Sequence, residues 1–288
     1  MKEEEFYIGY YPNAPKNIAK VIKIAVGVIF SIIFLTIFVI TRSENGFANS
    51  QFEYGTLTEL EGILYQKPVP MLRVFTGKDA SGKNLYKSVL LVNLNKFGAE
   101  NLLMEYTRKG ISEGESLVKL RGTLIYHDGV TVMELTEQEN ALLGFSKTIC
   151  GENKTSKTEI FDEEKPAFEV KKADSPCDLR TLKTYGEVAF DGEIIDPKCF
   201  FGAMKPGFGK PHRDCAIRCI AGGIPPVFVV KNPNGEVNYM LITDENGQAI
   251  NQIILKFVAI PMKLQGNLEK IDEWFVLRVK TNVNKKPR

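Results

Sequence analysis

The residues best suited to chemistry are gathered in one stretch of the chain. Residues 196–226, DPKCFFGAMKPGFGKPHRDCAIRCIAGGIPP, contain three of the five cysteines and one of the two histidines in 288 residues. Thiolates and imidazoles bind metals such as zinc, and cysteines also form disulfides or act as redox groups. The stretch is therefore a candidate metal site, a candidate redox dithiol, or the disulfide of a secreted domain.

A short helix is predicted over the segment KPHRDCAIRCIAGG, because proline suits the first turn of a helix and the paired glycines suit its stop. Three side chains then fall on one face, at i, i+3 and i+7: His212, Cys215 and Cys219. Cys199 comes from the end of a preceding strand, and the glycines and prolines in between allow the chain to fold back. We therefore expect these four side chains to converge.

Three interpretations of this cluster stay open. Three sulfurs and one imidazole make a complete set for a single metal ion, with zinc expected first and copper or iron next, and no other cofactor is expected. A Cys215–Cys219 disulfide would be strained on a helix, but Cys199 can bridge to either and leave a free thiol. A reactive redox cysteine is disfavoured because the sequence lacks C-x-x-C, and the spacing matches no standard zinc finger.

Four other residues with reactive or large side chains are expected to have ordinary structural roles. Met204 and Asp196 offer further metal ligands, but a buried methionine and a turn former at a strand end are favoured. His127 lies in a YHDG turn and is expected to be solvated, whereas Trp274 is expected to pack in the core. No Ser-His-Asp arrangement, phosphate loop or carboxylate pair stands out, so no catalytic residue is predicted and a non-catalytic role is favoured.

The other two cysteines flank a polar segment. Residues 147–182 are charged and without a periodic pattern, which is typical of a linker. Cys150 and Cys177 lie near its ends, and in an oxidising compartment we predict a disulfide between them, worth about 3–4 kcal/mol from loop entropy. The odd number of cysteines leaves at least one thiol without an internal partner in such a compartment.

An uncharged apolar run at residues 24–40 predicts a membrane span. About 20 apolar residues cross a bilayer, so residues 21–41 are expected to form a transmembrane helix after a cytoplasmic arm, residues 1–20. A cleaved signal peptide is disfavoured, because the region before the run is too long. Three lysines precede the run and Arg42 alone closely follows it, so the N-terminus is expected in the cytoplasm and the bulk of the chain outside it.

The chain also contains an internal repeat. VKLRGTLIYHDGVTVMEL (118–135) aligns without gaps on MKLQGNLEKIDEWFVLRV (262–279), and each stretch predicts a β-hairpin. Upstream, GTLTELEGILY matches GEVAFDGEIID, which pairs Gly62 with Gly192. Middle strands and a helix-compatible segment lie between these matches in both copies. Strands, then a helix, then a closing hairpin is the order of elements in an OB-fold barrel.

We therefore predict a mainly β protein in which an N-terminal transmembrane helix is followed by two tandem OB-fold-like β-barrels, at residues 53–146 and 183–281. The second copy is 14 residues longer, because Gly62 to Gly122 is 60 residues and Gly192 to Gly266 is 74. The cysteine cluster follows the first strand of the second copy. It is thus predicted to be an insertion in the loop that joins strands 1 and 2, which helps to frame the ligand face of such barrels.

At the cluster, the sequence resembles a little-characterised family of bacterial secreted or membrane-anchored proteins. Their pattern is an aspartate, a cysteine with an aromatic residue, a glycine-containing loop, H-x-x-C-A-x-x-C and a Gly-Pro exit. It is matched here by Asp196, Cys199, Phe200, Gly202, His212, Cys215, Ala216, Cys219 and GGIPP. The match leaves out the first copy and the apolar run. The resemblance implies a bacterial envelope protein that accompanies respiratory or other redox enzymes.

Together these patterns predict a protein of the bacterial inner membrane whose bulk is periplasmic. Its expected role is an accessory or assembly subunit of a respiratory or other redox membrane complex, in which the cluster is a metal or structural site. The competing prediction is an electron carrier or a thiol redox protein that uses the same cluster. Nucleic-acid binding is disfavoured, because the net charge is only +2 and basic and aromatic residues do not alternate.

Overall fold

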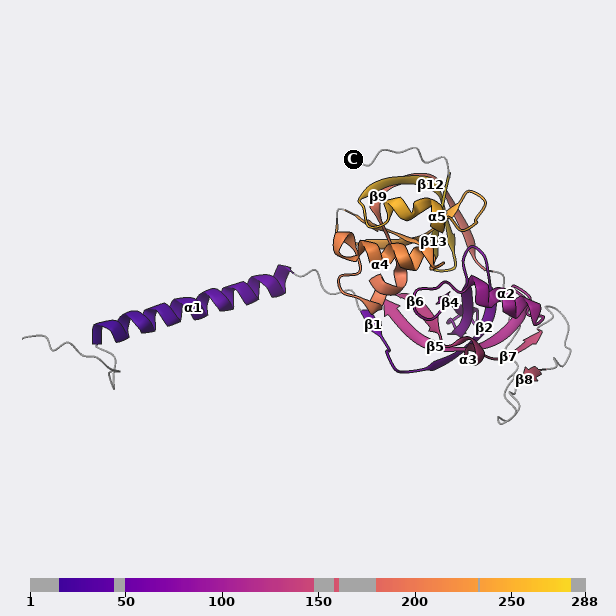
Figure 1. The fold of residues 1–288 in the computed structure, drawn as a ribbon, viewed down its shortest axis with the longest axis horizontal. Coiled ribbons are helices and arrows are strands. Elements are labelled where there is room, and N and C mark those ends of the chain that lie inside the picture. Colours follow the sequence, from indigo (N-terminus) through magenta and orange to yellow (C-terminus); the bar gives the residue numbers. More distant parts are fainter. Residues whose placement is uncertain (1–15, 44–49, 148–157, 161–179, 233, 281–288) are drawn as a thin grey trace, which may run out of the picture. The chain divides into compact units, whose positions relative to one another are not determined.

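The structure is a computed structural model that describes residues 16–43, 50–147, 158–160, 180–232 and 234–280. The chain forms two compact units, Met1–Phe47 and Ala48–Arg288. The first contains one long helix, and the second is mainly β and includes a closed five-stranded barrel (Figure 1).

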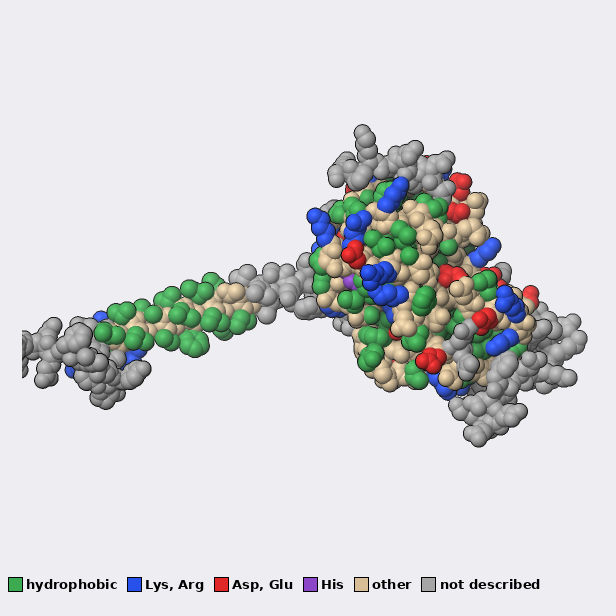
Figure 2. Space-filling model, in the orientation of Figure 1, with side chains coloured by type: hydrophobic (Ala, Val, Ile, Leu, Met, Phe, Trp, Pro, Cys, Tyr) green, Lys and Arg blue, Asp and Glu red, His purple; other side chains and the backbone are tan. Residues whose placement is uncertain are grey.

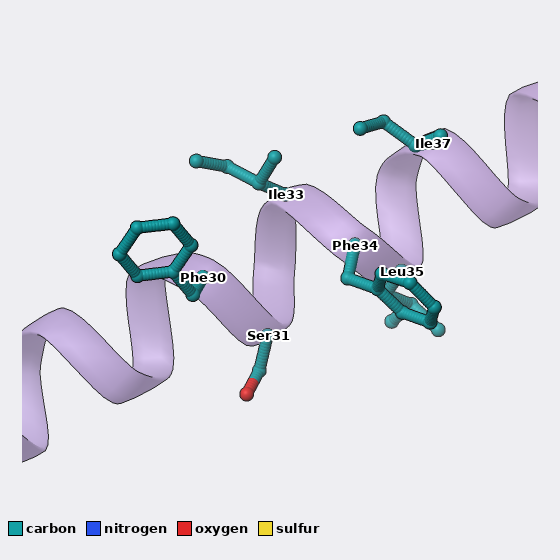
Figure 3. Close-up of a pocket in the computed structure, with 6 residues that line it drawn as sticks. All are labelled: Phe30, Ser31, Ile33, Phe34, Leu35 and Ile37. Atoms are coloured by element: carbon teal, nitrogen blue, oxygen red, sulfur yellow. The ribbon is translucent and has the colours of Figure 1, made fainter.

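Helix α1, Lys16–Ser43, is the only described element of the first unit. Its span Ile18–Phe38 has a mean hydropathy of 2.7 and is not buried within the protein. Apolar side chains cover this span and project from it in several directions (Figures 2 and 3). The hydroxyls of Ser31 and Thr36 donate to carbonyls four residues earlier, at 2.8 Å each, so their hydrogen bonds are made within the helix. By length and composition α1 suits a membrane anchor or a signal sequence.

The second copy of the repeat forms the closed barrel. Its strands pair in the order β10-β11-β13-β12-β9, and the β11–β13 pairing is parallel while the others are antiparallel. The strands are β9 (Leu182–Ile195), β10 (Val227–Lys231), β11 (Val237–Asp244), β12 (Met262–Ile271) and β13 (Trp274–Val279). Between β11 and β12 lie two short helices, α5 (Asn251–Ile254) and η2 (Leu255–Phe257).

The first copy forms an eight-stranded sheet. Its order is β2-β3-β4-β6-β5-β7-β8, with β1 on β5 and an additional pairing of β2 with β5. The strands are β1 (Ser50–Phe52), β2 (Thr58–Tyr65), β3 (Met71–Lys78), β4 (Asn84–Val92), β5 (Ser116–His127), β6 (Val130–Leu135), β7 (Leu142–Lys147) and β8 (Thr158–Ile160). The helices are α2 (Glu100–Arg108), between β4 and β5, and α3 (Gln138–Ala141), before β7. Both copies therefore hold a helix where the sequence predicts one.

The registers of the strands confirm the predicted repeat. Gly122 pairs with Thr58, and the equivalent Gly266 pairs with Val188, so the same positions meet in both copies. A Cβ on Gly122 or Gly266 would lie 2.4 or 2.2 Å from a carbonyl oxygen of the next strand, which explains why both are glycine. Both hairpins turn through an aspartate with positive φ, 46° and 51°: Asp128 and Asp272.

One hydrophobic cluster joins the two copies, and we call this packed boundary the seam. Its buried members include Val69, Met71, Leu90, Val92, Ile125 and Val132 of the first copy and Ile195, Phe201, Val227, Tyr239, Leu241 and Trp274 of the second. Trp274 is 1% exposed, and its Nε1–H donates to the carbonyl of Ser88 across the seam at 2.8 Å. The prediction that Trp274 packs in the core is confirmed, and the shared core explains why Ala48–Arg288 is one compact unit.

Little of the predicted linker belongs to the described residues. Within it, β8 pairs with β7 through Thr158 and Ser146, so this piece extends the first sheet. Cys150 and Cys177, with the disulfide predicted between them, lie outside the described residues.

Candidate metal centre

The cysteine cluster lies between the first two strands of the second copy, as predicted. After β9 ends at Ile195, the chain forms a short π-helix, η1 (Cys199–Ala203), and then α4 (Gly209–Ala221), before β10 begins at Val227. The predicted helix is thus confirmed as α4, and it ends before Gly222 and Gly223 as expected. π-Helices are rare in proteins, and many of those that occur lie at functional sites. Here the π-helix carries Cys199.

The structure places the four predicted side chains in two overlapping groups that share Cys199, and it does not group His212 with Cys215 or Cys219. The Sγ atoms of Cys199, Cys215 and Cys219 all lie within 4.8 Å of one another, and all three cysteines are free. A second group joins a nitrogen of His212, a carboxylate oxygen of Asp196 and the Sγ of Cys199 within the same limit. Cys199 belongs to both groups. Either group could hold a metal ion, and Asp196, which the sequence favoured as a turn former, is part of one.

Hydrogen bonding and burial shift the pKa values of two side chains in this cluster, Cys199 and His212. Cys199, Cys219, His212 and Asp196 are buried, and only Cys215 is partly exposed. A hydrogen bond with Cys219, burial, and the charge of Asp196 raise the pKa of the Cys199 thiol. Burial lowers the pKa of His212. Near neutral pH, Cys199 therefore keeps its proton and the imidazole is neutral, so a metal ion would displace a thiol proton but would find the imidazole ready to bind.

Two polar atoms at the centre have no hydrogen-bond partner in the described part of the chain. These are Nε2 of His212 and Oδ2 of Asp196, and both are buried. The other carboxylate oxygen of Asp196 accepts the backbone N–H of Lys198 at 3.0 Å. A buried polar atom without a partner costs about 1–3 kcal/mol. A cation between these residues and the thiols would satisfy both atoms, so the residues present fit a metal ion.

The first copy supplies one wall of the centre. Lys96 donates from Nζ to Sγ of Cys215 at 3.3 Å, and this hydrogen bond raises the pKa of Lys96. The N–H of Gly98 donates to the carbonyl of Gly222, just after α4, at 3.0 Å. The chains approach so closely that a Cβ on Gly222 would lie 2.0 Å from the carbonyl oxygen of Lys96. In Figure 1, α4 accordingly lies between the strands of the two copies.

An ion pair between a buried lysine and a partly buried glutamate fixes the other side of the insertion. Nζ of Lys198 lies 2.5 Å from Oε1 of Glu134 and also donates to the carbonyls of Asn93 and Asn95. Lys198 is 6% exposed and directly precedes Cys199 in the chain. The insertion is thus packed against the first copy, whereas the sequence suggested a loop that frames an open ligand face. Sequence patterns gave no sign of the roles of Lys96, Glu134 and Lys198.

His127 is buried, so the prediction that it is a solvated turn residue is wrong. It is 5% exposed, and its Nε2 lies 2.9 Å from the hydroxyl of Tyr239 in the second copy. Its ring stacks on Phe201 with centroids 5.1 Å apart. The hairpin that carries His127 is polar in sequence, but the insertion covers it at the seam.

Met204 is exposed, so the prediction of a buried methionine is also wrong. It follows η1 directly, its N–H donates to the carbonyl of Cys199 at 3.0 Å, and its side chain is 44% exposed. Its Sδ lies 3.8 Å from Sγ of Cys215. A thioether therefore stands next to the one partly exposed thiol of the cluster.

Comparisons with protein-family models, with curated proteins and with solved structures found no match.

Proposed function

We propose that this protein is a membrane-anchored accessory or assembly subunit of a redox membrane complex, and that its outer unit carries one thiolate-bound metal ion. The proposed ligands are Cys199, His212, Cys215 and Cys219, with Asp196 beside them. The observation that carries the proposal is the pair of buried, unpartnered atoms, His212 Nε2 and Asp196 Oδ2, next to the free thiol of Cys199, which also belongs to the group of three free thiols. Thiolate and imidazole together suit zinc, copper or iron.

The proposed architecture is two tandem OB-like barrels, at 53–146 and 183–281. The pairings β2-β3-β4-β6-β5, with β5 returning to β2, follow the same order as the closed barrel of the second copy. The third and fifth strands of each copy run parallel, and a helix lies between the third and fourth. This connectivity supports an OB-like barrel in both copies, with the seam covering one side of each.

The proposed location is the bacterial inner membrane, with the N-terminus in the cytoplasm and Ala48–Arg288 in the periplasm. An apolar helix of membrane-spanning length and the excess of lysines before it support this orientation. A disulfide between Cys150 and Cys177 is proposed with it, because the periplasm is oxidising. A reporter fused to the C-terminus that is active only outside the cytoplasm tests the orientation, and an inactive fusion would contradict it.

A non-catalytic role agrees with how the centre is enclosed. A catalytic metal site keeps a coordination position open to substrate, whereas a structural or storage site has a complete set of protein ligands. In the proposed centre, three sulfurs and an imidazole make up such a set, and all of them except the Cys215 thiol are buried. The centre therefore favours holding an ion over acting on a bound substrate.

An electron carrier is the second candidate, and a chain of aromatic rings favours it. Phe200 follows Cys199 and lies 5.8 Å from Phe201, which lies 5.1 Å from Tyr239 and 6.5 Å from Trp274, measured between ring centroids. A coloured or EPR-active ion that changes oxidation state reversibly would support this role. Stoichiometric zinc, which has no redox chemistry, would exclude it.

Metal analysis and thiol counting on the same sample test the proposed centre. The full chain, purified in detergent without oxygen, should hold one ion per chain, and removing the ion should expose three thiols in a Cys150→Ser/Cys177→Ser background. Asp196→Asn should weaken metal binding, whereas Asp214→Asn, at an exposed aspartate on α4, should not. A chain that retains no ion, or that contains one disulfide and one thiol in the cluster, would contradict the proposal.

A further inference from the structure

The thiol cluster has one side open to solvent, and the sulfur of Met204 lies there. Among the three thiols, Cys199 is 7% exposed and Cys219 1%, whereas Cys215 is partly exposed. Met204 is 44% exposed and its Sδ lies 3.8 Å from the Cys215 Sγ. An ion that reaches the buried sulfurs from solvent on this side meets the thioether and the Cys215 thiol first.

The backbone holds Met204 at this position. Its N–H donates to the carbonyl of Cys199, so the backbone of Met204 is held against the π-helix that carries the buried thiol. Beyond it the chain doubles back, because a Cβ on Gly207 would lie 2.5 Å from the Cα of Phe200.

The chemistry of these groups favours a soft, singly charged ion. Thiolate and thioether sulfurs together select copper(I), whereas zinc in proteins is bound by thiolate, imidazole and carboxylate. The ammonium of Lys96, 3.3 Å from the Cys215 Sγ, also bears on the choice. Its positive charge opposes a divalent cation more than a monovalent one, and it partly neutralises the negative charge of a copper(I)–thiolate centre.

We propose that Met204 is a ligand for copper(I), which enters at the Met204–Cys215 pair and is held by the cysteine cluster. This inference rests on the proposed metal centre and names the ion that the centre selects. Binding changes no oxidation state: copper(I)–sulfur bonds form, and each coordinating thiol that is protonated releases its proton to solvent. The thioether carries no proton and keeps its bonds.

Competition against a chromophoric copper(I) chelator, with the full chain in detergent and without oxygen, tests this role. Met204→Leu keeps the size and apolar character of the side chain and should weaken copper(I) binding about tenfold or more, the scale on which losing a supporting group affects metal sites. The same variant should bind zinc within about twofold of the natural chain, because zinc does not use the thioether. Met104→Leu, an exposed methionine on α2, is the matched control and should change neither affinity.

The outcomes separate this inference from the proposed function. Unchanged copper(I) affinity in Met204→Leu would overturn the role of Met204, and so would an equal loss of copper(I) and zinc, which indicates a damaged fold. If the natural chain binds zinc but no copper(I), the proposed centre stands and this inference fails. If it binds neither ion, the proposed centre itself fails.

Discussion

The ion pair at the seam predicts that Glu134 strongly stabilises the unit Ala48–Arg288. Lys198 is 6% exposed, and Glu134→Gln would keep the shape of its partner while leaving the ammonium without a counter-charge. Removing one member of a buried ion pair costs about 3–5 kcal/mol. The carbonyls of Asn93 and Asn95 still accept from Lys198, so we expect a loss at the lower end, about 3 kcal/mol.

Urea unfolding of the unit Ala48–Arg288 measures this loss. A double variant, Glu134→Gln with Lys198→Met, should recover part of it, because no buried ammonium remains. Glu137→Gln, an exposed glutamate two residues beyond the seam strand β6, is the matched control and should change the free energy of unfolding by less than about 0.5 kcal/mol. Lys198 also donates its N–H to Asp196, so Glu134→Gln should weaken metal binding as well.

If Glu134→Gln lowers the free energy of unfolding by less than about 1 kcal/mol, the effect would be no larger than that of breaking a solvent-exposed ion pair. It would mean that Lys198 and Glu134 are solvated, and that the first copy does not close over the insertion. The wall that Lys96 and the neighbouring carbonyls form beside the thiols would then be wrong as well.

Three further predictions concern the centre and the seam. In the metal-free chain at neutral pH, iodoacetamide should modify Cys215 well before Cys199, because Cys199 is buried and its pKa is raised. Peptide mass spectra that show equal rates of modification at the two cysteines would contradict this. Burial lowers the pKa of His212 in the folded chain. Below pH about 6.5 the unfolded chain therefore binds more protons than the folded chain. The free energy of unfolding should fall as the pH drops through that region. A His212→Gln variant should lose part of this dependence, because burial also lowers the pKa of His127, and an identical pH profile would count against it. Gly222→Ala should cost about 1–3 kcal/mol in thermal unfolding, because its Cβ would meet the carbonyl of Lys96, and an unchanged Tm would show that the seam is open there.

Local patterns carried most of what could be predicted from the sequence. Helical spacing alone put His212, Cys215 and Cys219 on one face, and α4 has the predicted place and end. The repeat was visible because glycines at close strand contacts, such as Gly122 and Gly266, cannot be replaced without moving a neighbouring strand. Such constraints act within one element or one strand pair, so a sequence records them at fixed spacing.

The contacts across the seam could not be predicted in this way. Lys96 and Cys215 are 119 positions apart, and they meet only because the two copies pack against each other. The same packing buries His127, whose polar turn sequence is typical of a solvated hairpin. No periodic pattern in either copy specifies how one will dock on the other, so the wall of the centre appears only in three dimensions.

X-ray absorption at the zinc edge tests the central claim most directly. The full chain loaded with one zinc ion should show three sulfur neighbours at about 2.3 Å and one nitrogen or oxygen neighbour at about 2.0–2.1 Å. These are the distances expected if Cys199, Cys215, Cys219 and His212 close around one ion. A shell of oxygen and nitrogen with fewer than two sulfurs would contradict the claim.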